Sequence, residues 1–498
     1  MNVNPITRLD YPDPDVIRVE DTYYMVSTTM HFMPGCEILQ SFDLVHWEHV
    51  TYVYETLDHT DAQQLKSGQN IYGQGMWAAS LRYHEGRFCI CFVANDTRKT
   101  YLYTSEKIDG PWKKQLIEGF YHDGSLLFDE DGRNYIVYGN DEIWITELNE
   151  DLTAPKKDGL HRLLVSDHKN PELGYEGSHI QKINGYYYIF LVHSLRDRWM
   201  RTEACFYSDS LEGEFTGGDV LCDDRGYCGQ GVAQGGIVDT PDGKWYAMLF
   251  QDSGAVGRIP ILLPVTWKDH FPFFGQNGHV PEEIEVHSTR PGYIYQPLVG
   301  SDDFCNGLLP RWQFNHDPDP RYYHLDALQG TYTITTREVC TELTQAVNTL
   351  TQRMSYPSCA AEVTVDASAL KEGDVAGLCA LQGCYAAVGI TKRHGKYEVR
   401  MLDKKEDGIL DMTEGTVVES HQMDFRLEAD FCNMKDEARC YYRVNKGDWL
   451  PIGTVHKLYF KLDHFTGCRF GLFCYAAEET GGSACFRDFK YYDVDEIS

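Results

Sequence analysis

The chain repeats one phrase five times, and its fourth copy reads Glu176-Gly-Ser-His-Ile-Gln-Lys-Ile-Asn-Gly-Tyr-Tyr-Tyr-Ile189. Each copy has an apolar stretch, a tight turn and an aromatic-rich stretch, which is the pattern of a β-hairpin. A hairpin that recurs at intervals of about 50 residues is typical of the blades of a β-propeller. The copies begin at Asp13, Ala78, Asp123, Glu176 and Gln234, and their turns lie at Asp21, Gly86, Gly132, Gly185 and Gly243.

Three of the five copies begin with a carboxylate. The first residue of each copy lies 8 or 9 positions before its turn, so the copies share one register. Because equivalent positions in a radial array converge on its axis, we expect Asp13, Asp123 and Glu176 to meet at one place. Up to 163 residues separate these three positions along the chain.

A second, shorter motif alternates with the hairpins. It is found at Ser41-Phe-Asp-Leu-Val-His-Trp47, at Ser105-Glu-Lys-Ile-Asp-Gly-Pro-Trp112 and at Ser208-Asp-Ser-Leu-Glu-Gly-Glu-Phe215. Each of these stretches is interpreted as the turn and outer strand of a blade whose inner strands are the hairpin. Four strands in each of five blades account for residues 1–290, which we predict to be a five-bladed β-propeller catalytic domain.

The rest of the chain has a different pattern. Residues 291–302 contain proline and glycine without periodicity and are predicted to be a linker. Residues 303–498 show alternating strands without the long repeat, such as Ala360-Ala-Glu-Val-Thr-Val365, which predicts an accessory β-sandwich domain and an all-β fold. We expect Asp302-Asp-Phe304 and Phe486-Arg-Asp-Phe-Lys-Tyr491 to pair, bringing the two ends of the sandwich together.

The composition restricts the partners of the protein. The 498 residues include 45 basic and 75 acidic ones, for a formal charge of −30. That charge argues against binding to nucleic acid or to an anionic membrane, and no apolar run reaches transmembrane length. A protein with this net negative charge is compatible with an uncharged substrate. The aromatic content of 13% suits both β structure and stacking against sugar rings.

The cysteines indicate a reducing compartment. The chain has 16 of them, none in a Cys-x-x-Cys pair, and Cys89 and Cys91 lie in a strand pattern. Cys205, Cys379 and Cys474 lie in apolar runs, as buried free thiols do. The first residues show no basic stretch followed by an apolar one, which a signal peptide would have. We therefore predict a cytoplasmic protein.

Converging carboxylates have a specific chemical use. Two carboxyl groups in unlike environments can break a glycosidic bond, because one protonates the leaving oxygen while the other attacks or activates water. A third carboxylate nearby raises the pKa of the acid by like-charge repulsion. The axis of a propeller offers all three groups from separate, rigid strands.

The chain also carries a set of shorter motifs. They are Asn4-Pro-Ile, Tyr11-Pro-Asp-Pro14, Asp21-Thr-Tyr-Tyr24, Gly75-Met-Trp-Ala78, Tyr175-Glu-Gly177 and Gly257-Arg258 in the first part, with Asn348-Thr-Leu-Thr-Gln-Arg353 and Gly373-Asp374 in the second. Together they resemble glycoside hydrolase family 43. The resemblance implies a five-bladed β-propeller xylosidase or arabinofuranosidase that inverts configuration, with that family's accessory sandwich.

The resemblance also implies roles for individual residues. Carried over position by position, Asp13 matches the general base, Glu176 the general acid and Asp123 the residue that tunes and orients the acid. Arg258 falls in the pocket, where its guanidinium can fork onto sugar hydroxyls. Trp77 would form a wall against the sugar ring. Arg258 also stands alone in an apolar run, so it needs a charged partner, which an axial carboxylate would supply.

Three positions depart from the pattern of the family or need comment. Asp15 stands where the family usually has Ser or Thr, and strand alternation predicts that its side chain points away from the axis. Gln234 replaces a histidine that holds water around an axial cation in many members, so we predict no metal and a sugar contact for Gln234. Phe32 follows the first hairpin, where the family builds the pocket rim; we expect a substrate contact, with loop packing as the equal alternative.

Two other functions agree less well with the residues. A retaining hydrolase of the fructan or sucrose type would need Asn-Asp-Pro-Asn, Arg-Asp-Pro and Glu-Cys, where this chain has Tyr11-Pro-Asp-Pro14, His122-Asp-Gly124 and Tyr175-Glu-Gly177. A propeller that only binds carbohydrate does not need three converging carboxylates, which repel one another. For the second domain we favour a structural role, such as lending a loop to the pocket rim, over binding of polysaccharide.

The sequence therefore predicts an inverting exo-glycosidase that removes a terminal pentose from xylan- or arabinoxylan-derived oligosaccharides. β-Xylosidase is the first interpretation and α-L-arabinofuranosidase the alternative. The general base and the general acid should lie about 6.5–9.5 Å apart. No cofactor is required, although Asp302, Asp303 and Asp488 could hold a structural calcium ion. The sequence gives no indication of the oligomeric state.

Overall fold

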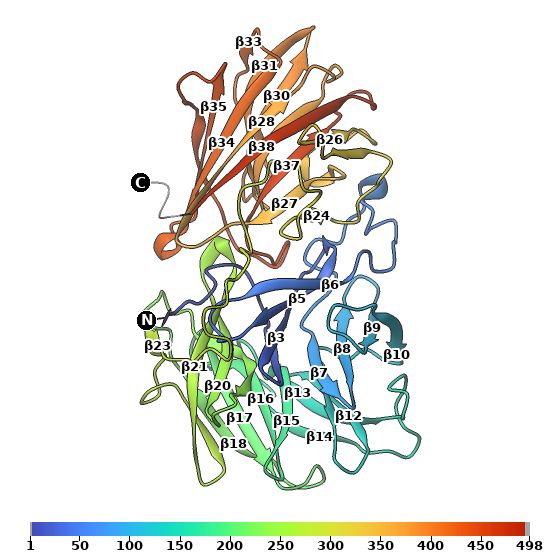
Figure 1. Ribbon diagram of the computed structural model, residues 1–498, viewed down its shortest axis with the longest axis vertical. Helices are drawn as coiled ribbons and strands as arrows, with labels where there is room; N and C mark the ends of the chain where they lie inside the picture. The colour runs from blue at the N-terminus through green and yellow to red at the C-terminus, as the bar shows by residue number, and fades with distance from the viewer. Residues whose placement is uncertain (1, 494–498) are drawn as a thin grey trace.

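The computed structural model describes residues 2–493, which form two β-rich bodies stacked along the long axis (Figure 1). The lower body contains the blue and green part of the chain, and the upper body contains the orange and red part. Helical structure in the described residues is limited to four short 3-10 turns. No helix in residues 2–493 combines the length and the apolar character that a membrane crossing needs.

The lower body is a five-bladed propeller, and each blade is a four-stranded antiparallel sheet; four blades use consecutive strands, and the first omits β4. The sequence repeat predicted this arrangement because each hairpin copy supplies the two inner strands of one blade. The blades are β2(Asp15–Val19), β3(Thr22–Ser27), β5(Gly35–Ser41), β6(Glu48–Tyr54); β7(Ser80–His84), β8(Arg87–Ala94), β9(Lys99–Ser105), β10(Lys113–Ile117); β11(Ser125–Phe128), β12(Asn134–Asn140), β13(Glu142–Leu148), β14(His161–Ser166); β15(Glu176–Ile183), β16(Tyr186–Ser194), β17(Arg201–Ser208), β18(Thr216–Leu221); and β19(Val232–Asp239), β20(Trp245–Asp252), β21(Arg258–Lys268), β22(Phe271–Phe274).

The upper body is a β-sandwich. One sheet has the order β32-β31-β30-β29-β37-β27-β24-β4, with β33 paired to β31, and the other has the order β25-β26-β38-β28-β34-β35-β36. The predicted pairing of the sandwich ends is confirmed by a bridge between Asp302 and Phe489. The strands are β24(Gln313–Asn315), β25(Tyr323–Asp326), β26(Thr331–Thr335), β27(Leu350–Arg353), β28(Ser358–Asp366), β29(Val375–Leu381), β30(Ala386–Arg393), β31(Lys396–Lys404), β32(Leu410–Met412), β33(Thr416–Val418), β34(Gln422–Asp430), β35(Glu437–Val444), β36(Leu450–Lys457), β37(Arg469–Tyr475) and β38(Ser483–Asp493).

The two bodies share a sheet and a buried ion pair. The short strand β4(Phe32–Met33) comes from the propeller part of the chain but pairs with β24 of the sandwich. Arg353 of β27 lies 2.8 Å from Glu37 of β5, and both side chains are almost fully buried. A buried pair of this kind is strongly destabilising to break, so it fixes how the sandwich sits on the propeller.

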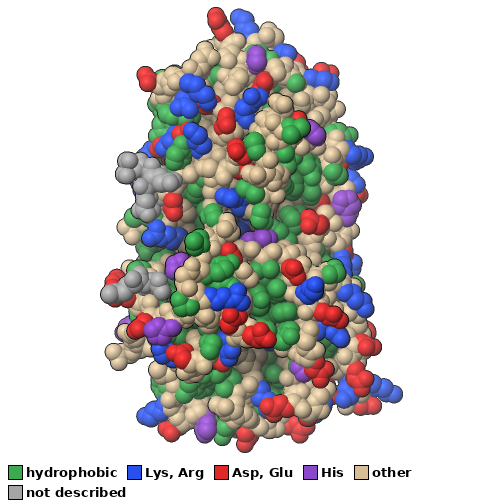
Figure 2. Space-filling view, viewed as in Figure 1, with side chains coloured by type: hydrophobic (Ala, Val, Ile, Leu, Met, Phe, Trp, Pro, Cys, Tyr) green, Lys and Arg blue, Asp and Glu red, His purple; other side chains and the backbone are tan. Residues whose placement is uncertain are grey.

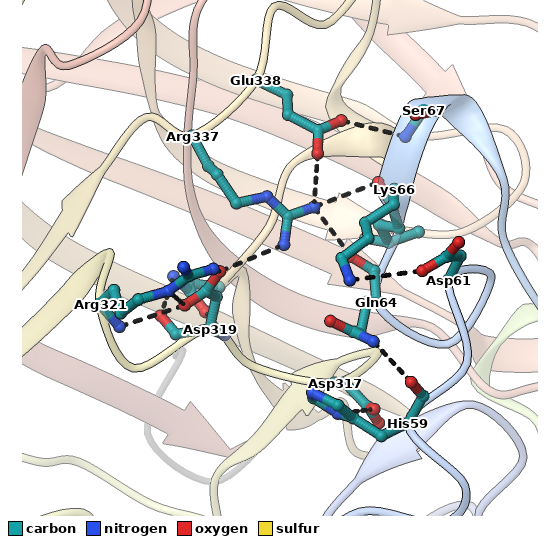
Figure 3. A network of polar contacts seen from close by, with 12 residues as sticks. His59, Asp61, Gln64, Lys66, Ser67, Asp317, Asp319, Arg321, Arg337 and Glu338 are labelled. Atoms are coloured by element: carbon teal, nitrogen blue, oxygen red, sulfur yellow. Dashed lines mark hydrogen bonds and ion pairs between the residues drawn. The ribbon is translucent and has the colours of Figure 1, made fainter.

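The connection between β6 and β7 is also held by the sandwich (Figure 3). It spans residues 55–79 and carries Trp77 near its end. The contacts are His59 with Asp317 at 2.7 Å, Arg337 with the Gln64 carbonyl at 2.9 Å, and the Ser67 amide with Glu338 at 3.1 Å. The sandwich therefore supports a propeller segment that leads to the predicted substrate pocket.

The first residues of three of the five hairpin copies depart from strand geometry. Asp13, Asp123 and Gln234 have φ values of 52°, 47° and 63°, in the left-handed region. Asp15 is fully buried and contacts Arg82 of the second blade at 2.7 Å and His179 of the fourth blade at 3.2 Å, so its side chain lies toward the axis. Residues i and i+2 of a strand point to the same face, which places Asp15 on the side of Asp13. Our expectation that Asp15 points away from the axis is wrong, because alternation separates neighbouring residues and Asp15 is two positions from Asp13.

Three buried histidines meet where the two bodies touch. The ring of His31 lies 4.8 Å from the ring of His316, and the ring of His464 stacks on Tyr72 at 3.9 Å. Burial lowers the pKa of all three histidines, and it lowers the pKa of His464 to about 4 against the opposing charge of Asp463. All three rings are therefore neutral at pH 7.

We expect this cluster to make the folded protein less stable in mild acid. The unfolded chain takes up a proton on His464 near pH 6.5, whereas the folded chain does so only near pH 4, so stability is lost as the pH falls between these values. His464 alone should account for a loss of about 2 kcal/mol between pH 7 and pH 5. Urea denaturation of the wild type and of His464→Gln at both pH values measures this difference. Equal pH dependence in the two proteins would contradict the expectation.

Charge is distributed over both bodies. Figure 2 shows acidic and basic side chains interspersed on this face, with acidic ones conspicuous over the propeller. This surface agrees with the formal charge of −30.

Candidate active site

The structure brings the three predicted carboxylates together at one end of the propeller axis. His122, Asp123 and Glu176 offer polar atoms that all lie within 4.8 Å of one another. Asp13 is close enough for its negative charge to raise the pKa of both His122 and Asp123. The main-chain N–H of Gly177 donates to Asp123 at 3.0 Å, which fixes Asp123 beside the Glu176 peptide. The shared register of the hairpins thus produces a compact acidic cluster.

Asp13 is held by groups from two blades. Its Oδ1 accepts a hydrogen bond from Nη1 of Arg258 at 2.9 Å, and its Oδ2 accepts one from the Thr28 hydroxyl at 2.6 Å. Arg258 is 3% exposed, and its Nε and Nη2 have no hydrogen-bond partner among the described residues. Arg258 is not among the residues that line the cleft, so a sugar contact from its two unpaired donors stays a prediction. The axial partner that the sequence predicted for Arg258 is Asp13.

Glu176 and Asp123 share a protonated neighbour. Glu176 accepts a hydrogen bond from Asn140 at 2.8 Å, and Nε2 of His122 lies 3.5 Å from Glu176 and 3.6 Å from Asp123. The charge of Asp123, followed by contact with Glu176, raises the pKa of His122 to about 9. Burial raises the pKa of Asp123 to about 6; Glu176 and Asp13 add to the rise and His122 opposes it. The protonation of Asp123 and that of His122 therefore depend on each other.

A cleft of about 620 Å³ opens over Glu176. Its propeller side is lined by Trp77, His122, Asn140, Leu173, Glu176, Trp199, Arg201, Gln230, Asp252 and Gly254. Its other side consists of Met434, Phe460, Lys461, Leu462 and Phe465 from the sandwich. The ring of Phe465 lies 4.3 Å from the guanidinium carbon of Arg258, so the sandwich reaches the residues that hold Asp13. Aromatic walls with a few convergent polar groups are typical of sugar-binding sites.

Comparison with known proteins identifies the family. The model of glycosyl hydrolases family 43 matches residues 3–272, which is more than half of the chain. The chain belongs to this family. The model of the beta xylosidase C-terminal concanavalin A-like domain matches residues 301–492.

Named relatives and solved structures support this membership. A protein of Formosa agariphila named beta-xylosidase is 26% identical over 99% of this chain and 89% of its own length. A Bacteroides ovatus protein named non-reducing end alpha-L-arabinofuranosidase is 24% identical over 82% of this chain and 79% of its own length. A solved structure described as bifunctional GH43-CE of Bacteroides eggerthii is 42% identical with a TM-score of 0.92. It covers 99% of this chain, and this chain spans 64% of that longer one.

Two of the predicted sugar contacts lie close to the carboxylate cluster. Trp77 lines the cleft, and its contact with a sugar stays a prediction. Gln234 is 4% exposed and lies against the main chain of Gly177, where an added Cβ would be only 2.7 Å from its Cγ. The N–H of Gln234 donates to the buried carboxyl group of Glu203 at 2.7 Å. Gln234 therefore supports the peptide that follows Glu176, and a direct sugar contact from it stays a prediction.

The structure places Phe32 away from the cleft, which corrects the contact that we expected. Phe32 is 2% exposed, and the guanidinium carbon of Arg469 lies 3.5 Å from the centre of its ring. Its strand β4 pairs with the sandwich, so the ring is part of the core between the two bodies. The alternative that we gave equal weight, packing of Phe32 within the protein, agrees better with this position.

Several residues of the site were not predicted. His122 directly precedes the hairpin copy that begins at Asp123, so the register that identified Asp123 could have included it. Asn140 and the pair of Arg201 with Asp252, which meet at 2.8 Å, give no such signal in the sequence. The sandwich residues of the cleft, such as Phe465, come from a part of the chain far beyond the last hairpin copy. The register of the hairpins therefore could not indicate them.

The structure offers one preformed group of metal-ligating side chains among residues 2–493, and it is His122 with Asp123 and Glu176. These are the side chains to which the family resemblance gives catalytic roles. Asp302, one of the three residues considered for calcium, accepts hydrogen bonds from Phe304 and Trp312, both at 2.8 Å. Its carboxylate thus stabilises the start of the sandwich, and a calcium ion at this point stays a prediction.

Proposed function

We propose that this protein is an inverting, exo-acting glycosidase that removes a terminal pentose from xylan- or arabinoxylan-derived oligosaccharides. β-D-Xylose is the preferred sugar. The observation that carries the proposal is the meeting of Asp13, Asp123 and Glu176, from three separate blades, beside an aromatic-lined cleft.

In the proposed mechanism the two catalytic carboxyl groups act from opposite faces of the sugar. Asp13 takes a proton from a water molecule as that water attacks the anomeric carbon, and Glu176 donates a proton to the leaving oxygen. Arg258 and Thr28 occupy both oxygens of Asp13 and so fix the plane of its carboxylate. The free donors of Arg258 bind a sugar hydroxyl, which places the anomeric carbon near Asp13.

Asp123 acts through its neighbours. It lies between His122 and the Gly177 amide, so it orients the peptide of Glu176. Burial, aided by repulsion from Glu176 and Asp13, raises the pKa of Asp123 to about 6, so this neighbour of Glu176 gives up its proton less readily than an ordinary aspartate. Asn140 keeps the Glu176 side chain directed into the cleft, where it protonates the leaving group.

α-L-Arabinofuranosidase activity by the same mechanism is the second candidate. It is supported by relatives that carry both names, such as the xylosidase/arabinosidase 43B of Humicola insolens, which is 27% identical over 98% of this chain. A non-catalytic carbohydrate-binding propeller is the remote alternative. A protein that only binds carbohydrate has no functional need for the raised pKa of Asp123 or of His122.

A panel of nitrophenyl glycosides tests this proposal, with the wild type compared to Asp13→Ala. We expect the highest kcat/KM on the β-D-xylopyranoside and lower activity on the α-L-arabinofuranoside. The reverse order would favour the arabinofuranosidase. Activity that persists unchanged in Asp13→Ala would exclude Asp13 as the base.

Proton NMR during hydrolysis tests the stereochemistry. We expect α-D-xylose as the first-formed anomer from a β-xyloside, because water attacks from the face opposite the leaving group. β-D-Xylose as the first product would refute the inverting mechanism.

A further inference from the structure

Asp10 lies three residues before Asp13, and its carboxylate joins two distant parts of the chain. It is 6% exposed. Its Oδ1 accepts a hydrogen bond from the main-chain N–H of Arg258 at 2.7 Å, and its Oδ2 accepts one from the N–H of Gly467 in the sandwich, also at 2.7 Å. Because both oxygens are engaged by N–H donors of the folded chain, an ionised carboxylate is the group that suits this position.

The surroundings leave room for this arrangement only because two glycines flank it. Gly257 has a φ of 105°, and a Cβ there would lie 2.3 Å from Oδ1 of Asp10. A Cβ on Gly467 would lie 2.2 Å from the Val256 carbonyl oxygen and 2.7 Å from Cβ of Asp10. The close approach of the two main chains therefore depends on glycine at both places, with Asp10 between them.

The two main-chain segments that Asp10 joins both lead to the proposed catalytic base. Arg258 donates through its side chain to Asp13. Gly467 ends the loop that carries Phe465, whose ring covers the guanidinium of Arg258 at 4.3 Å. Asp10 thus holds the backbone of Arg258 and the backbone behind its aromatic cover at the same time.

Asp10 is itself fixed from a third direction. Its carbonyl oxygen accepts a hydrogen bond from Nε of Arg353 at 2.9 Å, and Arg353 forms the buried pair with Glu37. A carboxylate that is immobile and has both oxygens hydrogen-bonded can hold the groups it binds at a fixed distance from each other.

We propose that Asp10 is a positioning residue for the hydrolytic reaction, and that it couples the sandwich loop of Phe465 to the Arg258–Asp13 pair. The sandwich is then a working part of the active site and more than a support for the propeller. This inference rests on the proposed function, since it assigns Asp10 a role in orienting the base of that reaction.

Asp10→Asn is the variant that tests the proposal most directly. The amide keeps one oxygen acceptor but turns an NH₂ group toward the other N–H donor, so one of the two bonds is replaced by a donor–donor contact. We expect kcat to fall about 10²-fold, as a displacement of the order of 1 Å at a catalytic group would cause. Glycoside turnover by the full-length protein gives kcat and KM separately.

Asp223→Asn is the matched control. The carboxylate of Asp223 also joins two segments through main-chain N–H groups, those of Arg225 at 3.1 Å and Val280 at 2.7 Å, but it does not line the cleft. The control should lose thermal stability and keep its kcat. A kcat in Asp10→Asn as high as in Asp223→Asn would overturn the proposal.

A double-mutant cycle separates positioning from a general loss of structure. If Asp10 acts through the loop of Phe465, the loss of kcat caused by Asp10→Asn should be several-fold smaller in a Phe465→Ala background than in the wild type. Independent, multiplicative losses would mean that the two residues are not coupled, and this outcome too would overturn the proposal.

Hydrogen exchange followed by mass spectrometry decides the coupling without any activity. Peptides containing the Arg258 and Gly467 amides should be protected to a similar degree in the wild type, and should exchange faster together in Asp10→Asn but not in Asp223→Asn. Rapid exchange at Gly467 beside a protected Arg258 in the wild type would refute the coupling even if the variant does not fold. If no glycoside is hydrolysed by the wild type, the proposed function fails, and this measurement still tests whether Asp10 joins the two segments.

Discussion

Asp13→Asn should lower kcat on xylobiose about 10⁴-fold, which is the upper range for loss of a general base. Asparagine keeps acceptor oxygen for Arg258 and has nearly the shape of aspartate, but it does not take a proton from water at neutral pH. KM should change little, because the donors of Arg258 and the aromatic walls remain in place. Steady-state kinetics on xylobiose, with xylose release as the readout, measures the effect.

The matched control for this variant is Asp424→Asn in the sandwich. Asp424 is also buried, and it accepts hydrogen bonds from Thr364 at 2.6 Å and from Arg443 at 2.8 Å, the same donor types that hold Asp13. The control reports what the loss of one carboxylate charge costs away from the cleft. If both variants lose the same modest activity, Asp13 is a structural carboxylate and the mechanism proposed above is wrong.

Glu176→Gln should give a loss of activity that depends on the leaving group. Xylobiose needs a proton on its departing oxygen, so kcat/KM should fall about 10³–10⁴-fold on that substrate. p-Nitrophenolate departs without protonation, so the loss on p-nitrophenyl xyloside should stay below about 10²-fold. Glutamine still accepts the hydrogen bond from Asn140, which keeps the side chain in place. Parallel kinetics on the two substrates measure the ratio.

Glu48→Gln controls for the change of charge alone. Glu48 is buried in the first blade and also accepts a side-chain amide, that of Gln40, at 2.7 Å. It should show no difference between the two substrates. If Glu176→Gln lowers kcat/KM equally on both substrates, Glu176 is not the general acid. Asp123 is then the next candidate for that role.

Much of the propeller could be predicted because its information is local. The alternation of apolar and polar residues, the turn residues and the interval between copies are all set within one hairpin. Radial symmetry then places the first residues of the copies together, so Asp13, Asp123 and Glu176 were found without knowledge of any contact. Arg258 was found as a cation that needs a partner, since a lone charge in an apolar run is costly.

The two failures have different causes. Residues i and i+2 of a strand point to the same face, so strand alternation by itself places Asp15 on the side of Asp13. Phe32 was assigned to the substrate pocket because its strand was treated as part of the propeller, whereas that strand completes a sheet of the sandwich. For Phe32, tertiary packing overrides the local pattern.

The blades, their register and the identity of the axial carboxylates could all be predicted, because each of these is encoded in residues that are neighbours along the chain. The cover of Arg258 by Phe465 and the bond from Asp10 to an amide 457 residues away became evident from the folded protein alone. The reason is that such contacts depend on how surfaces from distant parts of the chain dock. Docking is the sum of many weak contacts and leaves no periodic trace in the sequence.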